Sequence, residues 1–401
     1  MNKVLFVTYY SPPVGMSGVM RVTKLAKYLP EFGWQPVFLT VKPISYFLYD
    51  QSLLKDLEGI KIYRSESLDP ARILYLWRKD KPVKVRGTGP LFLNYLLFPD
   101  AKVLWVPFAL SLGRKVISQE KPRLIFATGP PYSALLLGVF LKRESGIPLV
   151  SDFRDPYPTG FTPPPLHFRS LVQILRRYIL KNSDTVVAVN QGTARQLEKQ
   201  AIIIENGYDP EEFEVKEDTE SGLRESKPPD KKLQILYAGT LWENEGALFA
   251  FLQAVGDIKD LQVLIAGRAS IDCQNRLKTL SPTVRYLGIL SHQTVINLMK
   301  SVDILLYLTK PNQSAGIKLY EYFGAGKPIL AVCESCNEAT RLIEYHNAGL
   351  ATNLNPEAIK STLLTILKQK ESFANQPIGW YSRRNQAQRL AHLFNQVVHQ
   401  G

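Results

Sequence analysis

Cysteine is scarce in this chain, with three residues in 401. Cys333 and Cys336 have the spacing of a redox pair or of half a zinc site, but no second cysteine or histidine pair lies nearby to complete a tetrahedral site. Three cysteines cannot form a disulfide framework, which is typical of proteins in a reducing compartment. We therefore expect a cytoplasmic protein without a metal site.

Long apolar runs are also missing. The most apolar region, Leu91–Leu112, is interrupted by two prolines and by Asp100 and Lys102, and a carboxylate at the centre of a bilayer would be costly. The first three residues lead directly into an apolar strand. The sequence therefore predicts neither a signal peptide nor a transmembrane span.

The loop after the first expected strand lacks the G-x-G-x-x-G pattern of dinucleotide-binding proteins. It offers only Gly15 and Gly18, and the second strand ends without an acidic residue for a ribose. We therefore expect no nicotinamide cofactor, and no cofactor of another kind. With Ser17 and Arg21, the same loop is either a site for an anion or a sugar at a helix start or an ordinary tight turn.

Acidic residues are depleted in the first half. Residues 1–205 carry 28 lysines and arginines against 15 acidic residues, whereas the remainder carries 21 of each. The excess positive charge of the first half indicates an anionic partner, which is a membrane surface, a phosphorylated substrate or a nucleic acid.

The chain is long enough for two domains, and strands and helices alternate in both halves. We expect an α/β protein with two Rossmann-like, doubly wound domains facing a cleft. The first domain spans residues 1–208, with 380–401 packing back on it as a C-terminal helix. Residues 209–232 form a linker, and residues 233–379 form the second domain.

The expected elements follow from apolar periodicity and from Gly and Pro punctuation. The expected strands are Lys3–Tyr9, Pro36–Val41, Lys61–Arg64, Leu124–Thr128, Leu149–Phe153, Thr185–Val189, Gln234–Ala238, Gln262–Ala266, Val284–Leu287, Ile304–Tyr307 and Pro328–Val332. The expected helices are Val19–Phe32, Tyr132–Glu144, Pro165–Lys181, Gly192–Gln200, Ala247–Val255, Thr294–Lys300, Gly316–Phe323, Glu338–His346, Pro356–Lys368 and Ser382–Val398.

The segment Gly316–Leu330 carries the strongest functional signal. Lys318 and Glu321 lie on one face of a short helix that starts after an exposed loop, where unpaired backbone amides favour a phosphate. A diphosphate next to a ribose suits such a pair, because the lysine and the amides bind the phosphates and the carboxylate accepts from vicinal hydroxyls. The alternative is a surface salt bridge on an ordinary helix.

Charged residues directly follow the expected strand Leu149–Phe153. Asp152, Arg154 and Asp155 stand at its carboxyl end, where open parallel sheets bind their ligands. In one interpretation an aspartate orients or deprotonates a hydroxyl while Arg154 fixes it. In the other, the two carboxylates pair with the guanidinium and bind nothing.

Other strand ends are expected to line the same cleft. Thr128 and Gly129 precede a helix in the first half, and Gly239 and Thr240 form the corresponding turn in the second half. Arg268 follows another strand and is either a phosphate-binding cation or a solvated loop residue.

Taken together, these motifs resemble bacterial glycosyltransferase family 4, whose members have the two-domain GT-B fold and use nucleotide sugars. The likeness covers nearly the whole chain and comprises Pro12-Pro13 to Gly18 with Arg21, Phe98-Pro99-Asp100 with Trp105, Thr128-Gly-Pro-Pro131, Asp152-Phe-Arg-Asp155, Asn206-Gly207-Tyr208-Asp209, Tyr237-Ala-Gly-Thr240, and Lys318-Leu-Tyr-Glu-Tyr322 with Gly326-Lys-Pro328.

The resemblance implies a nucleotide-diphosphate sugar held by the second domain, an acceptor held by the first, and retention of configuration without an obligatory metal. Glu321 would bind the ribose hydroxyls and Lys318 would neutralise the diphosphate, with Gln313, Gly316, Gly239, Thr240 and Arg268 completing the donor site. Asp155, Asp152 and Arg154 would lie near the reacting sugar. Gly15, Ser17, Gly18, Arg21, Thr128 and Gly129 would form the acceptor and phosphate loops. A leaving phosphate oxygen can take the acceptor proton, so no protein nucleophile is needed.

The sequence departs from the family pattern in three ways. The paired glutamates of the family are reduced to Gln313 and Glu321, and an amide cannot carry the charge of a carboxylate. The usual arginine and lysine of the second domain are replaced by Thr240 and Glu245, and the acceptor-side histidine of several members is absent.

We therefore expect a hexosyltransferase-like enzyme of polysaccharide biosynthesis with a lipid-linked or glycan acceptor. The aromatic segment Tyr95–Phe108 and the arginines of Arg169–Lys181 would rest on the anionic inner face of the cell membrane, unless the aromatics are core and the helix is solvated. The alternatives are a nucleotide-sugar epimerase of the same fold, a non-catalytic sugar-nucleotide-binding scaffold, and a nucleic-acid-binding protein that uses the basic half. No recognised nucleic-acid-binding module supports the last, so no nucleic acid is expected.

Overall fold

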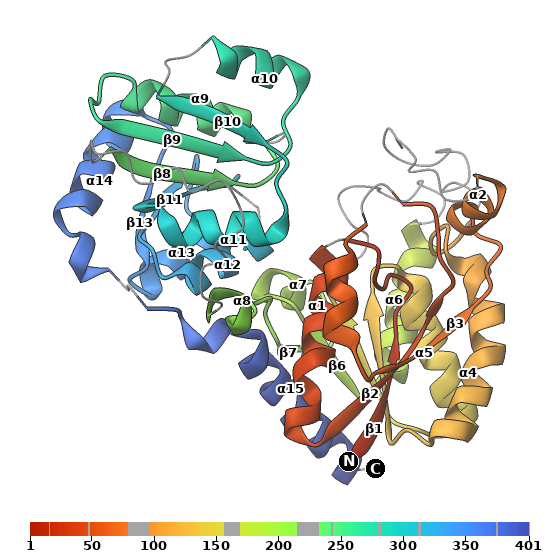
Figure 1. The fold of residues 1–401 in the computed structure, drawn as a ribbon. Helices are drawn as coiled ribbons and strands as arrows, with labels where there is room; N and C mark the ends of the chain where they lie inside the picture. Colours follow the sequence, from red (N-terminus) through yellow and green to blue (C-terminus); the bar gives the residue numbers. More distant parts are fainter. Residues whose placement is uncertain are drawn as a thin grey trace. The chain divides into compact units, whose positions relative to one another are not determined.

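The computed structural model describes residues 1–15, 17–46, 49–78, 97–155, 169–214, 232–241, 244–279, 283–311, 314–373 and 376–400. The chain divides into two compact units. The first unit contains Met1–Glu205 and Arg383–Gly401, and the second contains Asn206–Ser382. Each unit is an α/β structure built on its own parallel sheet (Figure 1).

The first unit has a seven-stranded parallel sheet in the order β3-β2-β1-β4-β5-β6-β7. Its strands are β1 (Asn2–Val7), β2 (Trp34–Val41), β3 (Lys61–Ser65), β4 (Leu124–Gly129), β5 (Leu149–Phe153), β6 (Thr185–Ala188) and β7 (Ile202–Ile203). Its helices are α1 (Ser17–Tyr28), α2 (Pro70–Arg78), α4 (Val106–Glu120), α5 (Tyr132–Ser145), α6 (Arg169–Asn182), α7 (Gln191–Arg195) and α15 (Arg383–Gln400), with short 3-10 turns at Leu29–Phe32, Gln51–Leu57 and Val103–Trp105. The strand order reverses between β1 and β4, which is where ligands bind in doubly wound sheets.

The alternation of side chains along the strands gives this sheet two apolar faces. In β1, Leu5 and Val7 pack on the side of α4, α5 and α6, whereas Val4 and Phe6 face α1 and α15. Parallel sheets are buried on both faces, so their strands are apolar throughout. This is why the central strands were recognisable in the sequence.

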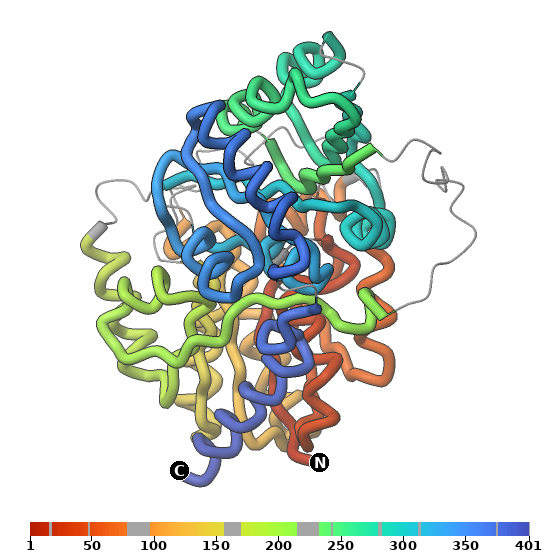
Figure 2. The backbone as a smooth tube through the Cα atoms, turned by 90° about the vertical axis from the view of Figure 1, so that its left-hand side faces the viewer, coloured from red at the N-terminus to blue at the C-terminus, as the bar shows by residue number. Residues whose placement is uncertain are grey.

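The C-terminal helix α15 belongs to the first unit. Phe394 stacks edge-on against Trp34, with 5.3 Å between the ring centroids, and the Trp34 indole donates to Asn395 Oδ1 at 3.0 Å. Figure 2 shows this helix, in dark blue, running alongside the first unit. The expected return of the C-terminal helix to the first domain is confirmed.

The second unit has a six-stranded parallel sheet in the order β10-β9-β8-β11-β12-β13. Its strands are β8 (Leu233–Ala238), β9 (Leu261–Ala266), β10 (Val284–Gly288), β11 (Ile304–Leu308), β12 (Ile329–Val332) and β13 (Gly349–Thr352). Its helices are α8 (Pro210–Glu214), α9 (Glu245–Val255), α10 (Ile271–Lys278), α11 (His292–Ser301), α12 (Ile317–Ala325), α13 (Glu338–Tyr345) and α14 (Pro356–Lys368), with 3-10 turns at Lys370–Ser372 and Gly379–Tyr381.

Two expectations on local structure need correction. The expected linker 209–232 begins with α8, whose Phe213 is buried in the core of the second unit, and residues 215–231 lie outside the described residues. Trp105, expected on a membrane-facing surface, is fully buried and donates to Ser65 Oγ at 2.8 Å. Tyr95 and Leu96 lie outside the described residues, and no described helix is long and apolar enough to cross a bilayer.

Candidate functional site

The first group of site residues gathers at the carboxyl ends of β4 and β5. Asp152 is fully buried, and its two oxygens accept from Arg21 at 2.8 and 3.3 Å and from Thr128 Oγ1 at 2.8 Å. Arg21, on α1, also donates to the Glu205 carbonyl at 2.7 Å. These hydrogen bonds commit the Asp152 carboxylate largely to partners within the unit. The structure therefore corrects the interpretation in which Asp152 pairs with Arg154, whereas the role of Asp152 on a substrate stays a prediction.

Arg154 lies against the start of α1. Its guanidinium donates to the carbonyls of Gly129 and Pro130, and a Cβ on Gly18 would overlap it. Burial lowers the pKa of Arg154, because the charged form loses hydration. A guanidinium next to the amide end of a helix places two positive features together, which is favourable when an anion lies between them.

The remaining first-unit residues lie around this point. Asp155 is exposed, and its backbone carbonyl accepts from the Tyr132 hydroxyl at 2.9 Å. Ser17 begins α1, and Gly15 lies buried just before it. Among these residues Asp155 thus presents the most accessible carboxylate.

In the second unit, α12 brings Lys318 and Glu321 together as predicted. The Lys318 ammonium donates to Glu321 Oε2 at 2.5 Å, and the Glu321 side chain is only 4% exposed. Gly316 is the N-cap and supplies no side-chain cap; its amide donates to the Tyr307 hydroxyl at 3.3 Å. The first turn of α12 thus has no side-chain cap, and just before it the Ala315 amide donates to Glu338 Oε2 at 3.2 Å. A phosphate at this helix start stays a prediction. Gln313 lies outside the described residues.

The turns after β8 and β9 pack tightly against each other. Leu241 donates its backbone amide to the Arg268 carbonyl at 2.9 Å, and Gly239 donates to the Ala266 carbonyl at 2.9 Å. Gly267 has a φ of 136°, and a Cβ there would overlap the Gly239 carbonyl. Arg268 is half-buried and Thr240 is exposed. Glu245, which stands where the family usually has a cation, accepts a hydrogen bond from Ser270 Oγ at 2.8 Å within the second unit.

Sequence reasoning missed His292, the first residue of α11. His292 Nε2 lies 3.0 Å from Glu212 Oε2 of α8. Burial lowers the pKa of His292, but the Glu212 hydrogen bond and the negative charge of Glu321 outweigh burial, and the pKa lies above its ordinary value. The only sequence signal was a histidine after the N-cap Ser291, which does not reveal contacts with a distant helix.

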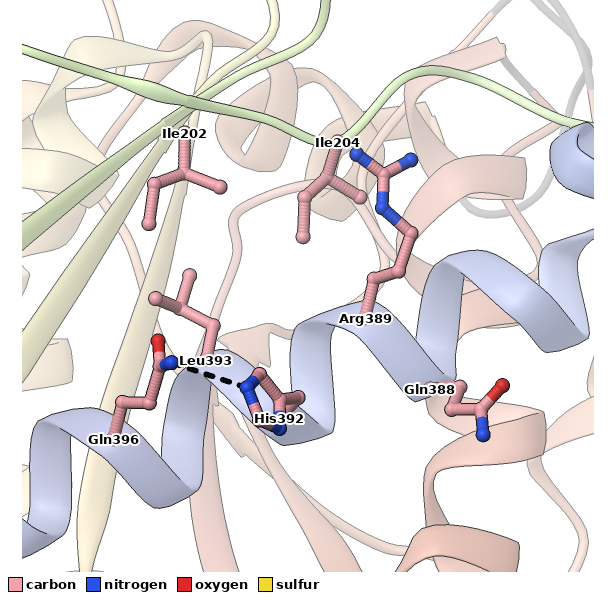
Figure 3. A pocket seen from close by; sticks show the side chains of 7 residues that line it. All are labelled: Ile202, Ile204, Gln388, Arg389, His392, Leu393 and Gln396. Atoms are coloured by element: carbon pink, nitrogen blue, oxygen red, sulfur yellow. Dashed lines mark hydrogen bonds between the residues drawn. The ribbon is translucent and has the colours of Figure 1, made fainter.

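One surface hollow of about 410 Å³ lies in the first unit and contains none of the predicted site residues (Figure 3). Its walls are Ile202, Ile204, Gln388, Arg389, His392, Leu393 and Gln396. Arg389 donates to the Glu205 carboxylate and to the Ile203 carbonyl, at 2.7 and 2.6 Å. The hollow lies where α15 packs against β7 and Ile204, and its arginine is bound to groups of the same unit. Among the described residues, no three His, Cys, Asp or Glu side chains gather as metal ligands. The absence of a metal stays a prediction.

Two family models match this sequence. Residues 18–204 match the family described as glycosyl transferase 4-like domain, and residues 232–369 match glycosyl transferases group 1. No curated protein matches the sequence.

Similar solved structures span the whole chain. A glycosyltransferase from Rickettsia africae is 18% identical with a TM-score of 0.69, covering 100% of this chain and 99% of its own. A protein described as a UDP-N-acetylglucosamine 2-epimerase from Listeria monocytogenes is 12% identical with a TM-score of 0.63, covering 100% and 97%. HepE from Anabaena, solved in complex with UDP, is 15% identical with a TM-score of 0.58, covering 100% and 98%. At these identities the likeness establishes the fold, and the two sequence families establish the class. The chain belongs to the glycosyltransferases of the GT-B fold, with a glycosyl transferase 4-like domain in its first unit and a group 1 domain in its second.

Proposed function

We propose that this protein is a retaining, family 4 hexosyltransferase that moves a sugar from a nucleotide-diphosphate sugar to a hydroxyl of a lipid-linked or polysaccharide acceptor. The observation that carries the proposal is the Lys318–Glu321 pair at the uncapped start of α12. The HepE neighbours, solved with UDP and with UDP-glucose, support a uridine nucleotide as the first donor to test.

In this proposal the second unit binds the donor. Glu321 accepts from the ribose hydroxyls, while Lys318 and the amides after Gly316 balance the negative charge that develops on the departing diphosphate. Preorganised charge of this kind is worth several kcal/mol in the transition state. Gly239, Thr240 and Arg268 line the turns that complete the donor site.

In the first unit, Arg154 supplies a second cation beside the α1 amides, and Arg21 and Asp152 hold that corner in place. Asp155 is the exposed carboxylate available to orient the acceptor hydroxyl. The departing phosphate oxygen takes the acceptor proton, the acceptor oxygen forms the new bond to the anomeric carbon, and the old bond to phosphate breaks on the same face. We further propose that the enzyme serves cell-surface glycan assembly in the cytoplasm.

Calorimetry with UDP, GDP, ADP and NAD tests the donor site directly. We expect tight binding of one nucleoside diphosphate, a loss of at least about tenfold in Glu321→Ala, and no change in Glu371→Ala, which removes an exposed glutamate of the same unit. Binding of NAD alone, or binding indifferent to Glu321, would overturn the assignment. Proton NMR of the transferred sugar then reads the anomeric configuration.

The epimerase is the second candidate, because an epimerase-described structure shares the fold over the whole chain. An epimerase changes the donor sugar without any acceptor, whereas a transferase releases nucleoside diphosphate in an acceptor-dependent way. Incubation of the bound nucleotide sugar with and without glycan acceptors separates the two. The two sequence families favour the transferase.

A further inference from the structure

Helix α2 of the first unit turns its apolar side outward. The exposed fractions are 56% for Leu68, just before the helix, and 50%, 56% and 78% for Ile73, Leu76 and Trp77. The last three stand at i, i+3 and i+4 and therefore share one helix face. We call these four residues the α2 surface.

The inward side of α2 carries polar groups as well as Ala71, which packs against the core of the unit, whereas its large aliphatic side chains and Trp77 are exposed. Arg72 is 6% exposed and donates to Glu66 Oε2 at 3.0 Å and to the Pro43 carbonyl at 2.7 Å. The buried Asp69 accepts from the amides of Ala71 and Arg72 and caps the helix start. An ion pair and a cap thus help to hold α2 on the unit, in addition to the contact of Ala71 with the core.

The α2 surface lies at the carboxyl edge of the first sheet. Because α2 directly follows β3, it begins at that edge, and Figure 1 shows it beyond the end of β3. Helices α4 and α6 lead into β4 and β6, so their first turns also lie at this edge. The first turns carry the exposed Phe108 and Leu171, and the exposed Ile174 follows in the second turn of α6. Arg154 and Asp155 follow β5 at the same edge, so the apolar surface and the first-unit site share one side of the unit.

The positive charge of the first unit favours an anionic partner for the α2 surface. The first unit carries 31 lysines and arginines against 15 acidic residues, whereas the second carries 18 against 21. Tryptophan and aliphatic side chains on a short helix, on a strongly basic body, fit the interface of an anionic bilayer, where apolar groups enter the headgroup boundary and cations stay in water. The arginines of α6 expected for this role are partly used, since Arg176 and Arg177 both pair with Glu198.

We propose that the α2 surface inserts into the interface of an anionic lipid membrane and docks the carboxyl edge of the first unit on it. The docking requires neither a nucleotide-sugar donor nor turnover, so it can be tested independently of the proposed sugar transfer. It places Asp155 on the side from which a lipid-linked acceptor arrives.

Co-sedimentation of the full-length protein with vesicles tests the proposal. One set contains phosphatidylcholine with phosphatidylglycerol and the other phosphatidylcholine alone. We expect binding to the anionic set, a loss of at least about tenfold in the double variant Leu76→Glu, Trp77→Glu, and partial loss in high salt. The matched control Ile271→Glu changes an equally exposed apolar residue of the second unit, at 76%, and should bind as the wild type does.

Because both substituted side chains are exposed, the double variant should unfold at the wild-type temperature, and its nucleotide affinity should be unchanged. Equal vesicle binding by wild type and double variant would overturn the proposal, as would binding to neither vesicle. Sedimentation velocity tests whether a second copy of the chain covers the α2 surface instead. A wild-type dimer that becomes monomeric in the double variant, without vesicle binding, would show that it does.

Discussion

Arg21 and Asp152 form a fully buried ion pair that joins α1 to β5 across 131 positions of sequence. Two hydrogen bonds connect them, and Thr128 and the Glu205 carbonyl satisfy further polar atoms of the pair. Desolvating two charges is costly, and the pair is tolerated because its polar atoms are matched. Its consequence is a fixed geometry for the loop that carries Arg154 and for the start of α1.

Breaking this pair from one side should be more damaging than removing both partners. Arg21→Met leaves the Asp152 carboxylate buried without its cation, and we expect a loss of about 3–5 kcal/mol in the free energy of unfolding. The double variant Arg21→Met, Asp152→Leu removes both charges and should recover a large part of that loss. Urea unfolding of the three proteins measures this, and equal losses in the single and double variants would contradict the argument.

Gly18→Ala should displace the Arg154 side chain with little effect on the stability of the protein. The added methyl group meets the Arg154 guanidinium, a flexible tip that can move, and alanine is favourable in a helix. We expect an unfolding free energy within about 1 kcal/mol of wild type, but a loss of transferase turnover similar to that of Arg154→Ala. The control Gly246→Ala adds a methyl group to a helix position that, apart from its chain neighbours and its own helix backbone, meets nothing within 4 Å. Full turnover in Gly18→Ala would show that the position of Arg154 is unimportant.

Glu120 should give the first unit part of its stability above acid pH. Its carboxylate accepts from Lys3, Lys61 and Tyr63 at 2.5–2.8 Å, and these bonds lower its pKa to about 2. A lowered folded pKa stabilises the protein above the unfolded pKa, and that contribution is lost as the pH falls towards 2.

Glu120→Gln is the corresponding variant. We expect it to be less stable than wild type by about 1–2 kcal/mol at neutral pH, with the gap narrowing below about pH 4. Thermal unfolding from neutral to acid pH measures the gap. A difference in stability that stays constant over that range would show that the loss comes from altered packing or hydrogen bonding and not from the missing charge.

The sequence predicted the apolar elements well and the long-range polar ones poorly. The strand Leu149–Phe153 and the helix Pro356–Lys368 were placed at their observed bounds, because apolar runs between Pro and Gly punctuation are local signals. Helix α4 was missed because Pro107 was interpreted as an interruption. It stands in the first turn, where proline lacks no needed hydrogen bond.

Weakly apolar elements were missed for a different reason. Helix α10 buries only Cys273 and Leu277, and β13 opens on Gly349 with a φ of 159°, so neither has a strong local pattern. In the site, the Lys318–Glu321 pair was predictable because i, i+3 spacing is local. The partner of Asp152 was not, because the fold selects Arg21 from a distant helix while the nearer Arg154 binds carbonyls.

His292 provides the final prediction, on the pH dependence of stability in the second unit. Its pKa is raised by Glu212 and Glu321 in spite of burial, so the protonated form is favoured in the folded protein. A raised folded pKa contributes stability that is fully present below the unfolded value, about 6.5, and is lost as the pH rises through the folded value. Replacing the imidazole removes this contribution.

We therefore expect His292→Gln to be less stable than wild type at mildly acid pH, with the gap closing as the pH rises past the folded pKa of His292. Urea unfolding of both proteins at several pH values measures the gap. His392→Gln is the control, because this histidine lies on α15 in the other unit and its bond to Gln396 is exposed. A gap that widens with rising pH would reverse the sign and show that the neutral imidazole is the form that Glu212 holds.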